Sequence, residues 1–405
     1  MAENFPRTMK EKIYKAFTRE GGVMLSPEAL EYLEGSIRGE AMLKGVSTEY
    51  IRRNGPELAD LCLIREIVES FDAKQDIYNI LNQEFREPNS LLKYRRLVEK
   101  MGREITPIYL LGDECSTIFG CYYKDKDGRE VLEDDGDVIP LDMSGCSGDV
   151  FLCDNIFIGI EGKKTDGRFV GLKVHLPGID KGVCRMPRLA EKDLKVLFFS
   201  DFQMSEINGR ILRKILSKVQ ADIVVIMGKL CLGRLSSISY TNFVNGFRLN
   251  GIRTQVPDII LCPDADDVYP SFLPKEIQVP EECSKVIKAA SNPFTLETRR
   301  CSIGVIREDI FKYKERGVFI GRNYVDSFVE TVLSQSSFNP FGISNLDVDR
   351  TPDVFVVGQD FYPFVTSVKG VTFISCPSFK DEMSFVSYDL SSGDATVLNS
   401  KHVLT

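Results

Sequence analysis

The stretch VLFFSDFQMSEINGRILRKILSKVQADIVVIMGKL, residues 196–230, decides the fold of the larger part of the chain. It opens with VLFFS, a continuous apolar run typical of a buried strand, and IVVIM at residues 223–227 is a second such run. Between them, apolar residues recur at helical spacing from Ile211 to Val219. Strand, helix and strand make one βαβ unit, so we predict an α/β domain over residues 190–405.

Three further apolar strands in this region, DIILC, DVFVV and VTFISC, end at Cys262, Val357 and Cys376. Open α/β sheets place their sites beyond the carboxyl ends of the strands. The candidate site residues are therefore those that follow the strands, and they read DFQ at 201–203, GKLCL at 228–232, PDADD at 263–267 and GQDF at 358–361.

Residues 105–180 change to a strand-like pattern. Short runs rich in β-branched and aromatic residues alternate with turns such as KDKDG and EDDGD. We expect five strands, near 108–111, 117–123, 138–141, 150–160 and 169–174, and such a set predicts a small barrel of the oligonucleotide-binding (OB) kind. The region carries 15 acidic and 7 basic residues. Because barrels that stack bases use basic grooves, a protein partner is favoured over single-stranded nucleic acid.

The first part of the chain reads as a helical domain over residues 1–75. Ser26 and Pro27 form a good helix start, and Leu30 and Leu33 begin an apolar face. Residues 76–104 are polar, with a break at Pro88 followed by a helix rich in Lys and Arg. We interpret this segment as a linker with a solvated helix, since its basic residues alternate with Glu99 and Glu104.

Composition limits the classes of function. The chain has 405 residues, 43% of them hydrophobic, and 59 acidic against 51 basic residues, a net charge of -8. This is a multi-domain globular chain with no overall attraction to a polyanion. No apolar run has the length of a membrane span and the first residues do not resemble a signal peptide, so we expect a soluble, intracellular protein. Its 11 cysteines show no CxxC spacing and are expected to be reduced.

The strand ends resemble the motifs of calcineurin-like metallophosphoesterases, which hold two metal ions with aspartates, an asparagine and histidines. Asp201 matches that pattern, but Lys229 stands at the position of the metal-bridging aspartate. The other matched positions also hold residues that differ from the family's ligands: Gln203, Leu232, Ala265, Asp266, Ser337, Gln359 and Phe361. The resemblance therefore implies this fold with a degenerate site.

Histidine content supports the same interpretation. The chain has only two histidines, His175 and His402, and neither follows one of these strands. A lysine ammonium at the bridging position would also repel the cations. We therefore expect no metal, no cofactor and no catalytic residue. The aspartates at the strand ends leave an all-oxygen site for Mg²⁺ or Ca²⁺ as a remote alternative.

Helical module, barrel and degenerate phosphodiesterase in this order are similar to the B subunits of replicative DNA polymerases, and most of all to the epsilon type. The motifs that carry the resemblance are CPDADD with PSFLP, SNPFTLETRRCSIGVIRED, FVETVLSQSSFNPF, PDVFVVGQDFYPF and ISCPSFKDEMSFVSYDLSSGDATV. Their order extends over about 200 residues.

This resemblance implies a non-catalytic scaffold in the nucleus. Its barrel and α/β domain would bind the zinc-containing C-terminal domain of the catalytic subunit. The helical module would be a tether to the replicative helicase through GINS, and contact with DNA would be indirect. The alternatives are the delta or alpha B subunit, an active phosphoesterase, and a free-standing single-strand-binding module. Residues 1–75 weigh against delta and alpha, the missing ligands against the enzyme, and the acidic barrel against the last.

Overall fold

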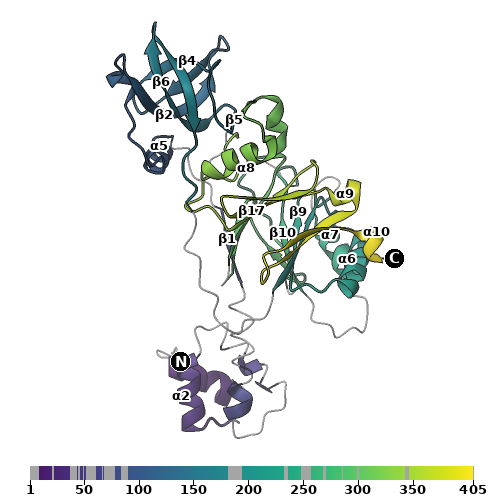
Figure 1. Ribbon diagram of the computed structural model, residues 1–405. Helices are drawn as coiled ribbons and strands as arrows, with labels where there is room; N and C mark the ends of the chain where they lie inside the picture. The colour runs from purple at the N-terminus through teal and green to yellow at the C-terminus, as the bar shows by residue number, and fades with distance from the viewer. Residues whose placement is uncertain are drawn as a thin grey trace. The chain divides into compact units, whose positions relative to one another are not determined.

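The structure is a computed structural model that describes residues 9–20, 22–36, 43, 46–48, 50–51, 61–65, 67, 78–83, 90–180, 194–231, 236–247, 257–267, 271–284, 286–298, 301–342 and 346–404. The chain forms two compact units, Met1–Asn79 and Ile80–Thr405. The smaller unit is helical, and the larger unit holds a barrel and an α/β region (Figure 1).

The helical unit contains α1 (Met9–Tyr14), the π-helical turn η1 (Lys15–Glu20) and α2 (Pro27–Ser36). Helix α2 starts as its sequence predicts, because the Ser26 hydroxyl accepts a hydrogen bond from Ala29 N at 3.1 Å. A separate apolar core holds the unit together, and its buried members are Ile13, Phe17, Val23, Ala29, Leu33, Leu43, Val46, Tyr50, Ile64 and Ile67. The unit therefore has its own core, as an independent domain does.

The barrel is closed by five strands in the order β2-β3-β4-β7-β6. They are β2 (Cys115–Lys124), β3 (Glu130–Glu133), β4 (Val138–Asp142), β6 (Ile156–Thr165) and β7 (Arg168–His175). The pair β4–β7 is parallel and the other pairs are antiparallel. Closure leaves the barrel no free sheet edge.

Two expectations about the barrel region are wrong. Residues 108–111 are not a strand, because Ile108–Leu110 form the 3-10 helix η2 behind Pro107. The helix at residues 90–99, α5 (Ser90–Glu99), is not a solvated linker helix: Leu97 and Met101 pack on Phe119 and Phe157 of the barrel. Apolar side chains on the outside of β2 and β6 need a cover, and α5 provides it.

A short strand joins the barrel to the α/β region. The expected strand over 150–160 is split by a turn, and its first part, β5 (Val150–Leu152), leaves the barrel. It pairs antiparallel with β14 (Val318–Ile320) of the α/β region. The amide N of Phe151 also donates to the buried Thr331 hydroxyl of α8 (Tyr324–Ser334) at 3.0 Å. Barrel and α/β region are therefore held together by backbone pairing as well as by side chains.

The α/β region is built on two six-stranded sheets. The first has the order β11-β10-β9-β8-β18-β19, with β8 (Lys195–Ser200), β9 (Ile223–Met227), β10 (Asp258–Cys262), β11 (Ile287–Ala289), β18 (Ser384–Asp389) and β19 (Ala395–Asn399). The second has the order β1-β12-β13-β15-β17-β16, with β1 (Tyr78–Asn82), β12 (Phe294–Thr298), β13 (Ser302–Arg307), β15 (Val354–Gly358), β17 (Val371–Cys376) and β16 (Phe364–Val368).

Helices cover the sheets. Helices α6 (Glu206–Lys218) and α7 (Ser237–Phe247) share an apolar core with the first sheet, next to the short C-terminal helices α9 (Phe379–Glu382) and α10 (Ser400–Leu404). Helix α8 lies between β5 and the second sheet (Figure 1). Strands β9 and β15 are buried at every residue, as expected for strands covered on both faces. The predicted fold class, a helical module with an OB-fold barrel and an α/β domain, is confirmed.

Candidate functional site at the strand ends

The ends of strands from both sheets meet where the two sheets adjoin. Asp201 follows β8 and has a left-handed backbone with φ 55°, and its amide N donates to Met227 O at the end of β9. The amide N of Gly228 in turn donates to Cys262 O at the end of β10. These bonds bring the loops after the three parallel strands to one place.

The side chain of one arginine, Arg307, lies at the centre of these loops. The Arg307 side chain is 3% exposed and comes from the last residue of β13. Its Nε donates to Asp201 Oδ1 at 2.8 Å, and its Nη2 donates to Asp201 Oδ2 at 3.1 Å. Nη1 donates to Gly358 O at 3.1 Å, at the end of β15. The bidentate pair with Asp201 reaches the first sheet, whereas the bond to Gly358 O lies within the second sheet. Together they use the planar fork that distinguishes arginine from lysine.

Two more carboxylates face the same guanidinium. Asp264 Oδ2 lies 3.6 Å from Arg307 Nε, and Asp360 Oδ1 lies 3.4 Å from Nη2. The second oxygen of Asp360 accepts from Lys229 Nζ at 3.2 Å. The structure thus places Asp201, Lys229 and Asp360 together, as neighbours of an arginine.

Burial and charge act in opposite directions on the pKa values here. Burial raises the pKa of Asp201, and the Arg307 guanidinium opposes that rise. Burial also favours a higher pKa for Asp360, but its hydrogen bond with Asp201 and the charges of Arg307 and Lys229 bring the net pKa below the usual aspartate value. Burial lowers the pKa of Arg307, but Asp201, Asp264 and Asp360 together outweigh it, so the net pKa is raised. The arginine is therefore charged at any physiological pH.

Beside this cluster, the buried Asp267 holds the loops after β9 and β10 together. Asp267 is 3% exposed, and its carboxylate accepts from Leu230 N and from Asp264 N, both at 2.7 Å. Burial raises its pKa to about 6. Asp266, by contrast, is exposed, and its amide N donates to Asp264 Oδ1 at 3.1 Å. The acids of the PDADD loop therefore stabilise the loop's own conformation.

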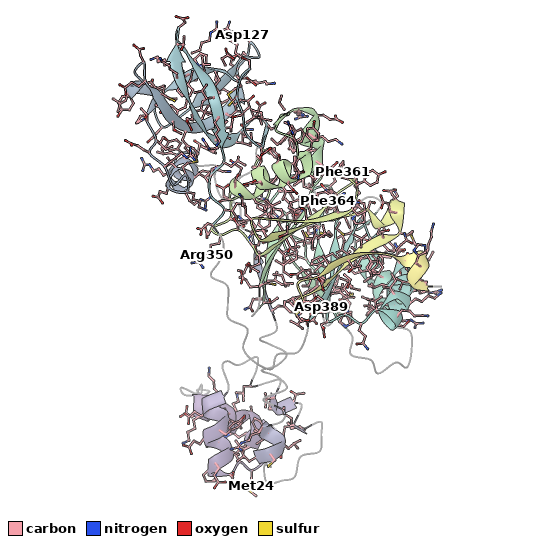
Figure 2. All side chains as sticks on the ribbon, viewed as in Figure 1. Met24, Asp127, Arg350, Phe361, Phe364 and Asp389 are labelled. Atoms are coloured by element: carbon pink, nitrogen blue, oxygen red, sulfur yellow. The ribbon has the colours of Figure 1, made fainter. Side chains whose placement is uncertain are left out.

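The loop after β15 is held by an amide network and by aromatic stacking. Gln359 Nε2 donates to Ser375 Oγ at 2.7 Å, and that hydroxyl donates to Tyr362 O at 2.9 Å. The Phe361 ring stacks on Phe311 at 4.6 Å, and Lys314 Nζ lies 4.5 Å from the Phe361 centroid. Figure 2 shows Phe361 and Phe364 close together on this part of the molecule. Neither Gln359 nor Phe361 offers an imidazole.

The remaining predicted positions lie at the margin or elsewhere. The carbonyl of Gln203 accepts from Asn208 Nδ2 at 2.8 Å, and Ala265 packs against the core of the second sheet. Ser337 is buried in the loop after α8 and forms a bridge with Asp347, in the neighbourhood of α5. Leu232 lies outside the described residues.

Arg307 is the residue that the sequence analysis missed. One signal was present: SIGVIR ends in a charged residue after a run of apolar ones, in the same way that VLFFS is followed by Asp201. A charge at the end of a buried strand needs a partner, so an arginine at one strand end and an aspartate at another are a candidate pair.

The donor set does not fit the pair of metal ions that the phosphoesterase motifs imply. Two cations, Arg307 and Lys229, already lie among the carboxylates, and further cations would be repelled. Over the described ranges, no group of three or more His, Cys, Asp or Glu side chains could hold a metal ion.

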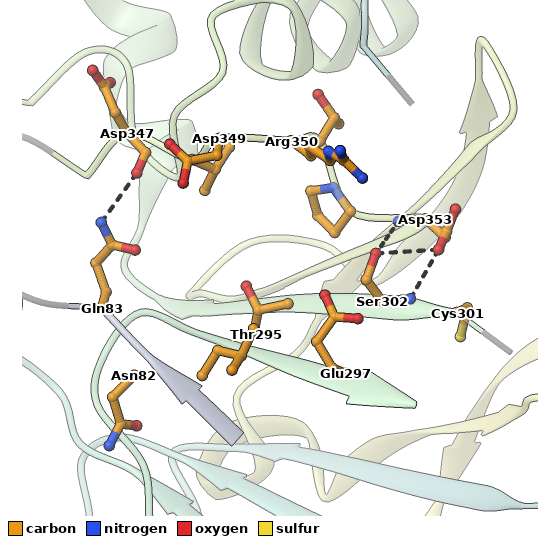
Figure 3. Close-up of a pocket in the computed structure, with 14 residues that line it drawn as sticks. Asn82, Gln83, Thr295, Glu297, Cys301, Ser302, Asp347, Asp349, Arg350 and Asp353 are labelled. Atoms are coloured by element: carbon orange, nitrogen blue, oxygen red, sulfur yellow. Dashed lines mark hydrogen bonds between the residues drawn. The ribbon is translucent and has the colours of Figure 1, made fainter. Parts of the chain in front are cut away.

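A separate cavity lies on the second sheet (Figure 3). It has a volume of about 360 Å³ and is lined by the end of β1, by β12 and β13, and by the loop 347–353. In it, Asp353 accepts hydrogen bonds from the backbone N and the hydroxyl of Ser302, at 2.8 and 3.1 Å, and Gln83 Nε2 donates to Asp347 O at 3.0 Å. The sequence analysis pointed to no site here.

Comparison with solved structures finds matches of low similarity. An archaeal phosphodiesterase shares 12% identity over 51% of this chain and 99% of its own, with a TM-score of 0.32. A protein of Thermus thermophilus shares 10% over 52% and 100%, with a TM-score of 0.31. Vacuolar Protein Sorting 29 from Cryptosporidium parvum shares 13% over 51% and 97%, with a TM-score of 0.28. Nothing about function follows from likenesses this low.

Sequence comparison is more specific. None of the curated proteins matches the chain. In the part of the chain that the structure describes, no helix is long and apolar enough to cross a membrane. Residues 74–178, which contain α5 and the whole closed barrel, match the family described as DNA polymerase epsilon subunit 2-like, OB-fold domain. The barrel and α5 are therefore similar to the OB-fold domain of the DNA polymerase epsilon subunit 2-like family.

Proposed function

We propose that the chain is the non-catalytic B subunit of a nuclear DNA polymerase epsilon complex, and that it binds the zinc-containing C-terminal domain of the catalytic subunit. The observation that carries the proposal is Arg307, which pairs with Asp201 where a phosphoesterase needs metal ions, in a chain whose barrel is similar to that of the epsilon subunit 2-like family. A site whose centre is filled by a fixed arginine is consistent with a domain that binds other proteins. It does not suit one that hydrolyses phosphate esters.

Charge favours a protein partner for the barrel. Residues 105–180 carry 15 acidic and 7 basic side chains, so the barrel repels a phosphate backbone and attracts a basic protein surface. Contact with DNA is then indirect, through the polymerase. The helical unit has its own core, and we assign to it the attachment to the replicative helicase through GINS.

Copurification tests the proposal. The tagged chain, expressed at native level, is expected to recover the catalytic subunit of polymerase epsilon in near-equal amount from nuclear extract. Recovery of the delta or alpha catalytic subunit would instead identify the chain as that polymerase's B subunit. Absence of any polymerase subunit would contradict the proposal. Metal-dependent phosphodiester hydrolysis that is lost in Asp201→Asn would make the chain an enzyme.

A further inference from the structure

The guanidinium of Arg307 contacts loops from both sheets at once. Asp201 follows β8 and Asp264 follows β10, in the first sheet, whereas Gly358 and Asp360 belong to β15 and its following loop, in the second. A second layer fixes the arginine's own backbone: its amide N donates to Asn292 Oδ1 at 3.0 Å, and its carbonyl accepts from Asn292 Nδ2 at 2.8 Å. The cation is therefore held rigidly between the two sheets.

Removing this cation would leave a buried charge without compensation. Asp201 is 2% exposed, and both of its oxygens are bonded to Arg307. The other cation nearby, Lys229, is about half exposed and bonds to Asp360. A buried carboxylate that loses its partner costs far more than an exposed one, because water cannot replace the partner.

We infer that Arg307 is a built-in substitute for a bound metal: a fixed cation that cross-links the two sheets and positions the loop 359–363. That loop carries Tyr362, which is 78% exposed, and Asp360, which joins Arg307 to Lys229. The fold of this region then depends on the charge of one side chain and on no divalent ion. This inference concerns how the site is held together and does not rest on the proposed partner.

A double-mutant cycle tests the role of the charge. Arg307→Met keeps an apolar stem and removes the cation, so its Tm is expected to fall by about 5 to 10 °C. Asp201→Asn is expected to lower the Tm too. The double variant should lose clearly less than the sum of the two, because neither charge is then left unpaired. Additive losses would overturn the inference, since a side chain that only fills space would give them.

Matched controls keep the test decisive. Lys288→Met removes a cation from the roughly half-exposed pair with Asp258 in the first sheet, and its Tm should stay within about 2 °C of the wild type. If Arg307→Met does not fold, folding of the double variant with Asp201→Asn supports the inference, and failure of both overturns it.

Two further readouts separate a fixed cation from simple packing. Hydrogen exchange in peptides that cover residues 359–363 should be faster in Arg307→Met than in wild type and unchanged in Lys288→Met; unchanged exchange in Arg307→Met would overturn the positioning role. The wild-type Tm should not respond to millimolar Mn²⁺ or to a chelator. A saturable rise of the Tm with Mn²⁺ would show that the site accepts a metal beside the arginine. That result would overturn the inference that Arg307 replaces the metal.

Discussion

At the scale of single residues, two aspartates of the α/β region have pKa values shifted in opposite directions. Asp267 accepts two backbone hydrogen bonds while buried, and burial raises its pKa to about 6. Asp389 at the end of β18 is the opposite case, because hydrogen bonds from Ser391 lower its pKa. Two aspartates in one domain should therefore affect stability with opposite dependence on pH.

The sign follows from which state binds the proton more tightly. In the folded state the pKa of Asp267 is raised to about 6, so the protonated side chain stabilises the folded state. This stabilisation is fully present below the ordinary aspartate pKa and is lost as pH rises from about 4 to about 6. Relative to Asp267→Asn, the wild type should lose roughly 2 to 3 kcal/mol of unfolding free energy over that window. Urea unfolding at several pH values measures this, and parallel curves would contradict it. Asp389→Asn is the control: relative to it, the wild type should lose stability as pH falls.

At the scale of elements, the joint between barrel and α/β region is made by backbone groups. Besides the β5–β14 pair, the buried Gln335 beyond α8 binds Phe157 of β6 through both amide atoms. Its Oε1 accepts from Phe157 N at 2.7 Å, and its Nε2 donates to Phe157 O at 3.0 Å. The side chain thus pairs with β6 in the way a neighbouring strand would.

Gln335→Leu is predicted to weaken this joint. It leaves a buried N–H and a buried C=O without partners, so the free energy of unfolding should fall by about 2 to 5 kcal/mol. Urea denaturation of the full chain measures the loss. Ser217→Ala, which removes an exposed hydroxyl bond to Lys214 O, should change it by less than about 0.5 kcal/mol. A Gln335→Leu loss as small as that control would mean that the joint relaxes or that water replaces the amide.

What the sequence predicts at this scale depends on the periodicity of each segment. The β8–α6–β9 unit was predictable because its apolar runs and helical spacing are long. The boundary between β5 and β6 was not, since residues 150–160 are apolar almost throughout and only the turn at Asn155, with φ 73°, separates the strands. The burial of α5 also depends on a distant partner, the outer face of the barrel.

The candidate site was predictable only in part, for a similar reason. Asp201 and Lys229 are adjacent to long buried strands, so their place at the sheet edge follows from the pattern alone. The position of Arg307 in the site could be predicted only by knowing that β13 lies beside β15 in one sheet and that their ends approach β8 of the other sheet. Neither is encoded by local spacing.

At the scale of the whole molecule, the chain consists of two units with separate cores. Deletion of residues 1–75 keeps β1, whose Asn82 Oδ1 accepts from Ser291 N at 2.8 Å. The shortened chain should therefore fold and still bind the catalytic subunit, while it loses the helicase. A pull-down tests both parts at once. Loss of the catalytic subunit would place the helical unit in the polymerase interface.

A longer deletion gives the matched control. Removing residues 1–83 also takes away β1, which exposes the edge of β12. This variant should be less stable than the shorter deletion, and equal stability would show that β1 contributes little to the sheet.

The place of β18 in the first sheet has a consequence for synthesis on the ribosome. Strand β8 is the first of its sheet to be made, yet one of its two neighbours is β18, which follows almost all of the α/β region in the sequence. Until β18 emerges, β8 presents an apolar strand with one unpaired edge, and such an edge recruits other chains. Termination between β8 and β18 is therefore expected to yield an aggregation-prone fragment, whereas the complete chain pairs both edges of β8.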